Sequence, residues 1–579
     1  MKSLFHSTPR PAGALSALSL ACLLLACAGV RKGGDNAGTG GNGNGDGGGS
    51  GPGPGLGGMG PGPGPGPSLI GACSADAKPS VGPTPVRRIT SLEYNNAARD
   101  LFGDLANPAS ASGFPSDERV GSFVSNTKTP LSSTNNEGYL TAAEGVASRF
   151  VTRFATASGC AAGDTACVEA FLLGLARRAF HGTLDADASA ALKALYERVS
   201  QKLDASAGVE AVVRSVLLSP RFLFMIEFGA PEADISRLTQ PEVAGRLAAY
   251  LWRTVPDLPL LALADSGALG SADQIKRQAE AMLADPRAQP MLDDFALQWL
   301  EIEDIQRISR DDAAFTPALR DAMMKETTLT FENAARAAST SFAQLLTSPT
   351  SYVNGDLAAL YGIPGPSVDF APTQMPANRR GILMQGAFLA TQAHPQTPSQ
   401  VLRGKAVREQ LLCDHIDSPP PGVERNIAVP GDMTSQQAFD AHTSVQPCAG
   451  CHQWLDPIGR GFGFFDNIGR YREIENGKPL TSKGEIVAGP TSPVTGTFSG
   501  ALELAQLLAS NEYVQQCFAV QATRFALGRD ERDADACSVK AAWDAFKAGQ
   551  LGIHQLFVAV TGTTAFSHRN TVRAGMICQ

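Results

Sequence analysis

The sequence predicts a mainly α-helical protein that is built from several blocks of helices and one small β-hairpin region. Apolar residues recur at helical spacing along much of the 579-residue chain, and capping signals precede several of these runs. Strand-like alternation is scarce, and residues 480–498 are the best candidate for the hairpin. Hydrophobic residues make up 43% of the chain, which is enough apolar material for a large buried core.

Individual helices can be placed from their start and stop signals. Thr90 and Glu93 form a capping box before an apolar run that Gly103 ends, and Thr239 and Glu242 form a second one. Further amphipathic runs cover residues 165–180, 186–200, 209–218, 272–284, 291–300, 325–339 and 501–508.

The net charge and the motifs that do not occur in the sequence exclude several classes of function. The formal net charge of −8 excludes a generic nucleic-acid binder, because such binding needs an excess of basic residues that displace counterions. The patterns typical of ATPases, zinc proteases with an HExxH helix and α/β-hydrolases do not occur in the sequence.

The N-terminus reads as an export signal. Lys2 and Arg10 precede an apolar run over residues 12–26, which is too short to span a bilayer comfortably. The run ends in Leu-Leu-Ala-Cys, with Cys27 last, which resembles a bacterial lipobox. We therefore expect a lipoprotein signal peptide over residues 1–26, lipidation of Cys27 and an extracytoplasmic, membrane-anchored protein, with the outer membrane favoured. The alternative is a plain secretory signal with Cys27 incidental.

A tether rich in glycine and proline follows over residues 27–72. Residues 31–67 hold 19 of the 60 glycines and six of the 38 prolines. Such a segment has little to bury, so it is predicted to be disordered and to hold the folded body away from the lipid surface.

Nine cysteines remain beyond the signal and anchor, and export allows disulfides. Cys160 and Cys167 are close enough to pair across a short loop. Cys517 and Cys537 lie at the ends of neighbouring helical segments and are predicted to pair as well. The sequence assigns no partner to three others: Cys73, Cys413 and Cys578.

The sharpest motif is Cys448-Ala-Gly-Cys451-His452, the CxxCH pattern of covalent c-type haem attachment. At this spacing the two thiols reach the two vinyl groups of one haem, and His452 binds the iron from the proximal side. A redox dithiol, half of a zinc site and a structural disulfide are the alternatives.

The residues around the motif carry a family resemblance. The run CAGCHQWLDPIGRGFGFFDNIGRYR (448–472) resembles the planctomycete-type cytochrome c-like domain, and the stretch 379–413 is similar to the same family. Six positions match its pattern: Asp456, Pro457, Gly459, Phe465, Asp466 and Gly469. Leu455 departs from it, since the family often has Met there. Other stretches resemble the associated domains of unknown function: 87–103, 171–180, 217–227, 237–252, 352–363 and 517–529.

The resemblance refines the fold class to a multi-block helical body with an embedded c-type cytochrome-like domain. The expected blocks are an N-terminal helical domain over 73–160, helical domains over 161–230 and 231–375, the haem domain over 376–478 and a C-terminal helical domain over 479–579. It also implies a secreted protein that bears one haem c and has no defined substrate.

The sequence offers several candidates for the second axial ligand of the iron. His442, six residues before the motif, is the best candidate for the distal position. The other candidates are His394, His415, Met433, Met384, His554 and His568. Five-coordinate iron is the alternative, and it favours ligand or peroxide chemistry over pure electron transfer.

Residues after the motif have two interpretations each. Five aromatic residues could pack on the porphyrin or form ordinary core: Trp454, Phe462, Phe464, Phe465 and Tyr471. Three arginines could pair with haem propionates or lie in solvent: Arg460, Arg470 and Arg472. Asp466 is expected to be a turn or cap residue.

The sequence thus favours an exported lipoprotein with one covalent haem that carries electrons or acts as a haem-dependent oxidoreductase. Its partner would be a redox protein or a small-molecule substrate, and no nucleic acid. The alternative is a cell-surface binding or scaffold lipoprotein without haem, in which the CxxC is closed as a disulfide.

Overall fold

The computed structural model describes residues 69–570 apart from 72, 75, 128–132, 233–234, 367–368, 418–427 and 444–448. The signal peptide, Cys27, nearly all of the tether, Cys448 and Cys578 therefore lie outside the described residues. The described residues belong to one compact unit. Among the described helices, none has the length and apolar character that a membrane span requires.

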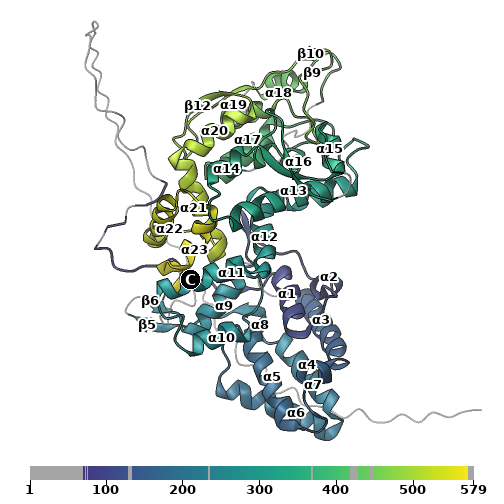
Figure 1. Ribbon diagram of the computed structural model, residues 1–579, viewed down its shortest axis with the longest axis vertical. Coiled ribbons are helices and arrows are strands. Elements are labelled where there is room, and N and C mark those ends of the chain that lie inside the picture. The colour runs from purple at the N-terminus through teal and green to yellow at the C-terminus, as the bar shows by residue number, and fades with distance from the viewer. Residues whose placement is uncertain are drawn as a thin grey trace, which may run out of the picture. The chain divides into compact units, whose positions relative to one another are not determined.

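The predicted mainly helical fold is confirmed (Figure 1). The first half of the chain contains α1 (Ser91–Phe102), α2 (Pro108–Ala111), α3 (Ser133–Val151), α4 (Phe154–Ser158), α5 (Thr165–Ala179), α6 (Ala186–Lys202), α7 (Ala205–Leu217) and α8 (Pro220–Leu223). Next come α9 (Gln240–Leu251), α10 (Leu258–Asp265), α11 (Ala272–Ala284), α12 (Gln289–Trp299), α13 (Pro317–Arg336), α14 (Phe342–Thr347) and α15 (Gly355–Tyr361).

The remaining helices surround and follow the CxxCH motif. They are α16 (Gly386–Thr391), α17 (Gln400–Leu411), α18 (Ser435–Thr443), α19 (Ala449–Gly459), α20 (Ala501–Ser510), α21 (Glu512–Leu527), α22 (Ala536–Ala548), α23 (Ile553–Thr561) and α24 (Thr564–Ser567). Short 3-10 turns join several of them: Pro286–Ala288, Glu303–Gln306, Ile382–Met384, Arg460–Phe462 and Asp533–Asp535.

Strands are short, and all their pairings are antiparallel. β1 (Arg87–Arg88) pairs with β4 (Phe224–Met225), β2 (Arg119–Val120) with β3 (Phe123–Val124), β7 (Thr350–Val353) with β8 (Ala371–Gln374), and β9 (Ile474–Glu475) with β10 (Lys478–Pro479). β6 (Ile235–Arg237) lies between β5 (Ala230–Glu232) and β13 (His568–Asn570). β11 (Lys483–Ile486) and β12 (Gly496–Ser499) form the hairpin predicted for this region.

The helix boundaries follow the local signals. Both predicted capping boxes are present, and Gly103 ends α1 in the left-handed conformation at φ 61°. α13 begins eight residues before the predicted start because Thr316 caps it and Pro317 occupies its first turn.

Two large cores hold the helices together. The first, under α1 to α8, contains buried side chains such as Tyr94, Phe102 and Val213. The second runs from α9 to the C-terminal helices and includes an aromatic cluster in which Phe295 contacts Trp299 and Phe518 with ring centroids 6.0 Å away in each pair. The second core also contains buried residues of the motif region, so this region packs into the helical body.

Three disulfides join described cysteines, and one predicted pairing is wrong. Cys160–Cys167 forms as predicted. Cys517 pairs with Cys413 and Cys537 pairs with Cys73, so the predicted Cys517–Cys537 bridge does not exist. Cys517 is fully buried in α21 and lies beside α17, where its Sγ is 3.7 Å from the carbonyl oxygen of Gln410.

The Cys73–Cys537 bridge belongs to an N-terminal segment, residues 69–82, that packs on the C-terminal helices. The Leu69 amide donates to the Gln516 side chain at 3.1 Å, and the Gly82 amide donates to Asp535 at 2.8 Å. The segment therefore ties the two ends of the compact unit together across 464 residues of sequence.

Candidate cofactor-attachment site

The motif lies at the start of α19, and its described part is open to solvent. Cys451 is exposed and carries a free thiol. His452, in the same helical turn, is partly exposed, with 24% of its side chain accessible. A side-chain carbon added at Gly450 would meet no atom of the described residues within 4 Å.

A buried carboxylate fixes the imidazole of His452. Its Nδ1 lies 3.0 Å from Oδ1 of Asp456, whose side chain is only 6% exposed. In the tautomer in which Nδ1–H donates to this carboxylate, Nε2 is the ring nitrogen left to bind a metal. Metal-bound histidines commonly donate their other ring nitrogen to such a partner.

The donor set therefore fits covalent haem. Among the described residues, His452 presents an imidazole held through Nδ1, Cys451 offers an accessible thiol, and no atom lies within 4 Å of a β-carbon placed on Gly450. Cys448, the second predicted thioether, lies outside the described residues.

Close backbone contact with α17 positions α19 (Figure 1). A β-carbon on Gly404 would come within 2.0 Å of the Leu455 carbonyl oxygen, and one on Gly459 within 1.8 Å of the Gln400 carbonyl oxygen. Glycine is needed at both positions because any side chain would push the two helices apart.

α18 also contacts this region and carries the predicted distal ligand, His442. Asp440 of α18 accepts from Arg460 at 2.8 Å and from Gln400 at 3.2 Å. One turn before His442, the ring of Phe439 stacks on the imidazole of His394 with centroids 6.0 Å apart.

Four of the other candidate distal ligands are exposed, contact polar groups elsewhere or are buried in the core. His415 is 87% exposed and lies near Asp417, and Nδ1 of His554 lies 3.1 Å from the Ala335 carbonyl oxygen. His568 lies 3.0 Å from the hydroxyl of Ser567, and Met384 is fully buried in the large core. His442 stays the favoured prediction.

The aromatic residues after the motif divide into two groups. Phe462 and Phe465 are buried, and Phe462 contacts Phe388 at 5.7 Å between ring centroids, so these two are core residues. Trp454, Phe464 and Tyr471 are half-buried.

The three arginines considered for haem propionates each pair with a carboxylate of the chain. Arg460 binds Asp440 at 2.8 Å, Arg470 binds Asp312 at 2.6 Å, and Arg472 binds Glu475 at 2.7 Å. Asp466 is a turn residue as predicted, since its Oδ1 accepts from the Ile468 and Arg470 amides at 3.0 and 2.8 Å.

A buried polar cluster beside the segment that follows the CxxCH motif had no sequence signal. Glu326 of α13 is fully buried and accepts from Ser351 at 2.6 Å and from Tyr361 at 2.5 Å. Burial raises the pKa of Glu326 to about 7, although both hydrogen bonds and the charge of Arg379 oppose this shift. Arg379 lies 4.0 Å above the Tyr361 ring and 4.9 Å from the Phe465 ring, and so links the cluster to the motif region.

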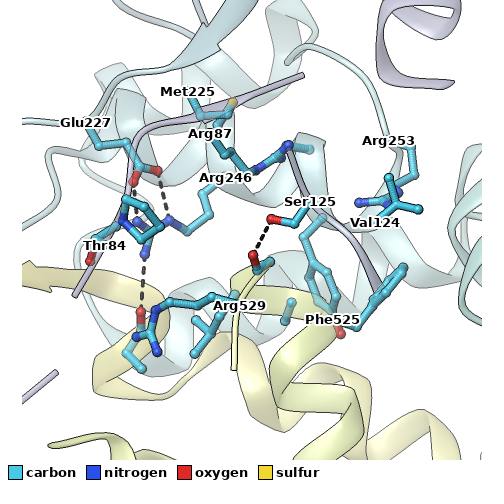
Figure 2. Close-up of a pocket in the computed structure, with 17 residues that line it drawn as sticks. Thr84, Arg87, Val124, Ser125, Met225, Glu227, Arg246, Arg253, Phe525 and Arg529 are labelled. Carbon is cyan, nitrogen blue, oxygen red and sulfur yellow. Dashed lines mark hydrogen bonds and ion pairs between the residues drawn. The ribbon is translucent and has the colours of Figure 1, made fainter. Parts of the chain in front are cut away.

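A cavity lined by arginines is a second concave site that sequence reasoning missed (Figure 2). Its charged lining residues are Arg87, Arg246, Arg253, Arg529 and Glu227. Each guanidinium already has a carboxylate partner: Glu93 for Arg87, Glu227 for Arg246, Asp294 for Arg253 and Asp535 for Arg529. The cavity is therefore a charge-compensated junction between distant parts of the chain and has little capacity for an added anion.

Five family models match the chain, all of them described as proteins of unknown function. They are DUF1587 at residues 87–152, DUF1595 at 167–227, DUF1592 at 238–363, DUF1588 (PSCyt3) at 379–475 and DUF1585 at 496–566. Searches of curated proteins and of solved structures found no match.

The matches identify the domains of which the chain is built. It is built from several of the domains of unknown function that are associated with planctomycete-type cytochromes c, as the resemblance predicts. Each matched range lies within one of the five expected blocks, and the CxxCH motif lies in the range that matches DUF1588.

Proposed function

We propose that this protein is an exported lipoprotein with one covalently bound haem c, which acts in electron transfer or as a haem-dependent oxidoreductase. The observation that carries the proposal is the His452–Asp456 contact at the exposed start of α19, next to a free Cys451 thiol. A purely structural CxxC would not need an oriented histidine with an unoccupied ring nitrogen.

Each residue has a separate task in this proposal. Cys448 and Cys451 hold the porphyrin through thioethers, and His452 binds the iron through Nε2. Asp456 keeps the proton on Nδ1 and makes the imidazole a stronger donor. His442 is the proposed distal ligand, and haem c supplies the Fe(III)/Fe(II) couple.

The proposal extends to location and partners. Lipidation at Cys27 would anchor the chain outside the cytoplasm, with the outer membrane favoured, and the tether would separate the helical body from the lipid. The partner is a redox protein or a small molecule that reaches the exposed end of α19.

Mass spectrometry of the mature protein tests the proposal. In a host that assembles c-type cytochromes, the peptide that contains residues 448–452 is expected to retain one haem after denaturation and proteolysis. An unmodified peptide, or one with a disulfide between the two cysteines, would favour the binding or scaffold alternative. Globomycin, which blocks lipoprotein signal cleavage, tests the anchor separately because the precursor should then accumulate.

A further inference from the structure

We propose that Arg408 is a positioning residue for His452, because it holds the helix that carries this iron ligand from the opposite side. The inference rests on the proposed function. Arg408 lies in α17, and its side chain is fully buried. It contacts α19, a loop after α17 and the hairpin region at the same time.

All three nitrogens of the Arg408 guanidinium have acceptors. Nε donates to the Trp454 carbonyl oxygen at 3.0 Å, Nη1 to Asp414 at 3.1 Å, and Nη2 to the Val487 carbonyl oxygen at 2.5 Å. Trp454 lies two residues after His452 and two residues before Asp456. The guanidinium therefore binds α19 midway between the iron ligand and the carboxylate that orients it.

This part of α19 needs an external contact because Pro457 lies inside the helix. Proline has no amide hydrogen, so the Gln453 carbonyl loses its usual partner four residues later. The first half of the helix, which carries Cys451 and His452, is consequently tied less firmly to the second half. Arg408 supplies a hydrogen bond at the next carbonyl along the chain.

The other end of Arg408 is held by a rigid frame. Oδ1 of Asp414 accepts from the Thr491 amide at 3.0 Å, the Thr491 hydroxyl at 2.7 Å and the Ser492 amide at 2.8 Å. A β-carbon on Gly489 would lie 2.2 Å from Asp414 and 2.5 Å from Arg408, so only glycine fits there. Cys413, next to Asp414, is bridged to Cys517 of α21.

Arg403 provides a matched comparison in the same helix. It is 1% exposed and also donates to carbonyl groups, at Leu389 (2.9 Å), Phe462 (3.2 Å), Phe465 (2.8 Å) and Asp466 (2.6 Å). These acceptors lie outside α19. Removal of either arginine costs stability, since each leaves buried carbonyls without donors, but of the two it is Arg408 that donates a hydrogen bond to the helix that bears His452.

The test uses the full-length haem-loaded protein with four variants: Arg408→Gln, Arg408→Lys, Arg403→Gln and Lys405→Gln. Lys405 is a half-buried residue of α17 that pairs with Glu409 and serves as the unperturbed control. The readouts are the ferric electron paramagnetic resonance spectrum, the midpoint potential and the thermal unfolding midpoint. A wild-type haem spectrum is recorded first.

We expect Arg408→Gln to change the ferric spectrum and shift the midpoint potential, and Arg408→Lys to restore part of the wild-type spectrum. Arg403→Gln should lower the unfolding midpoint and leave both haem readouts unchanged. A folded Arg408→Gln protein with the wild-type spectrum and potential would overturn the inference. If Arg408→Gln does not fold, Arg408→Lys carries the test with the same criteria.

A wild-type protein without haem would refute the proposed function rather than the contact itself. Amide hydrogen exchange in α19 of that colourless protein then decides whether Arg408 fixes the helix. Faster exchange in α19 of Arg408→Gln than of Arg403→Gln supports the contact, and equal exchange in the two variants contradicts it.

Discussion

Nδ1 of His452 lies 3.0 Å from Oδ1 of Asp456, one helical turn further along α19. Both residues belong to one helix, so their contact does not depend on the packing of distant segments. The pair orients the imidazole and directs Nε2 away from the carboxylate. This geometry is what a proximal iron ligand requires, and it arises from the spacing of His and Asp four residues apart.

Substitution of Asp456 should raise the midpoint potential of the haem. The carboxylate stabilises the more positively charged ferric state, and Asp456→Asn removes its charge while it keeps an acceptor for Nδ1. Asp456→Ala removes both and should change the ferric spectrum as well. Redox titration measures the effect, with Asp544→Asn, an exposed residue of α22 that pairs with Lys540, as the control. Equal potentials in wild type and both Asp456 variants would show that the contact does not tune the iron.

Gly404→Ala should separate α17 from α19. The added methyl group would lie 2.0 Å from the Leu455 carbonyl oxygen, and such overpacking costs about 1–3 kcal/mol or more. Gly174→Ala in α5 is the matched control, since its methyl group would meet no atom within 4 Å and alanine favours a helix by about 1 kcal/mol. Urea unfolding should therefore give a lower unfolding free energy than wild type for Gly404→Ala and a higher one for Gly174→Ala.

Two of the disulfides, Cys413–Cys517 and Cys160–Cys167, should differ in how much they contribute to the free energy of unfolding. Cys413–Cys517 closes a loop of 104 residues, whereas Cys160–Cys167 closes one of seven. On the chain-entropy account the longer loop contributes about 5 kcal/mol and the shorter about 2 kcal/mol. Replacing both cysteines of a bridge with alanine should therefore lower the unfolding free energy more for Cys413–Cys517 than for Cys160–Cys167, as measured by chemical denaturation. Peptide mapping that found Cys517 bound to Cys537 would contradict the assignment.

Glu326 should make stability depend on pH in a defined window. Its pKa is raised from 4.5 to about 7, so the folded protein keeps a proton that the unfolded chain has released between these values. Stability should therefore fall as the pH rises from 4.5 to 7, by about 3 kcal/mol if this group acts alone, and level off above pH 7.

Glu326→Gln isolates that contribution, because glutamine does not titrate; its amide oxygen accepts from one of the two hydroxyls, of Ser351 or Tyr361, and its amide NH2 group faces the other. The difference in unfolding free energy between variant and wild type should grow in favour of the variant as the pH rises from 4.5 to 7. Glu332→Gln, on the same helix, is the control. A constant difference across this range would show that Glu326 is not protonated in the folded state near pH 6.

The sequence was most informative where signals were local. The Thr90 and Thr239 capping boxes, the 483–499 hairpin and the short Cys160–Cys167 loop all depend on residues close in the chain. Asp456 was noted only as a match to the family pattern. Its contact with His452 is an i, i+4 pair on one helix face, so the spacing alone was enough to predict it.

The long-range features could not be predicted in this way. Cys73 and Cys537 are 464 residues apart, and their pairing depends on how the N-terminal segment crosses α22. Arg408 and Glu326 look like ordinary charged positions of helices, and only the packed structure shows that both are fully buried. The pairing of Arg470 with Asp312 has no local signal either, because the two residues are 158 positions apart in the chain.

The most direct test of the account is a pyridine haemochrome spectrum of the full chain, matured in a host with c-type haem assembly. The account predicts a c-type α-band with about one haem per chain, and its loss from the covalent fraction in a Cys448→Ala/Cys451→Ala variant. A colourless, fully folded protein with a disulfide between Cys448 and Cys451 would contradict it.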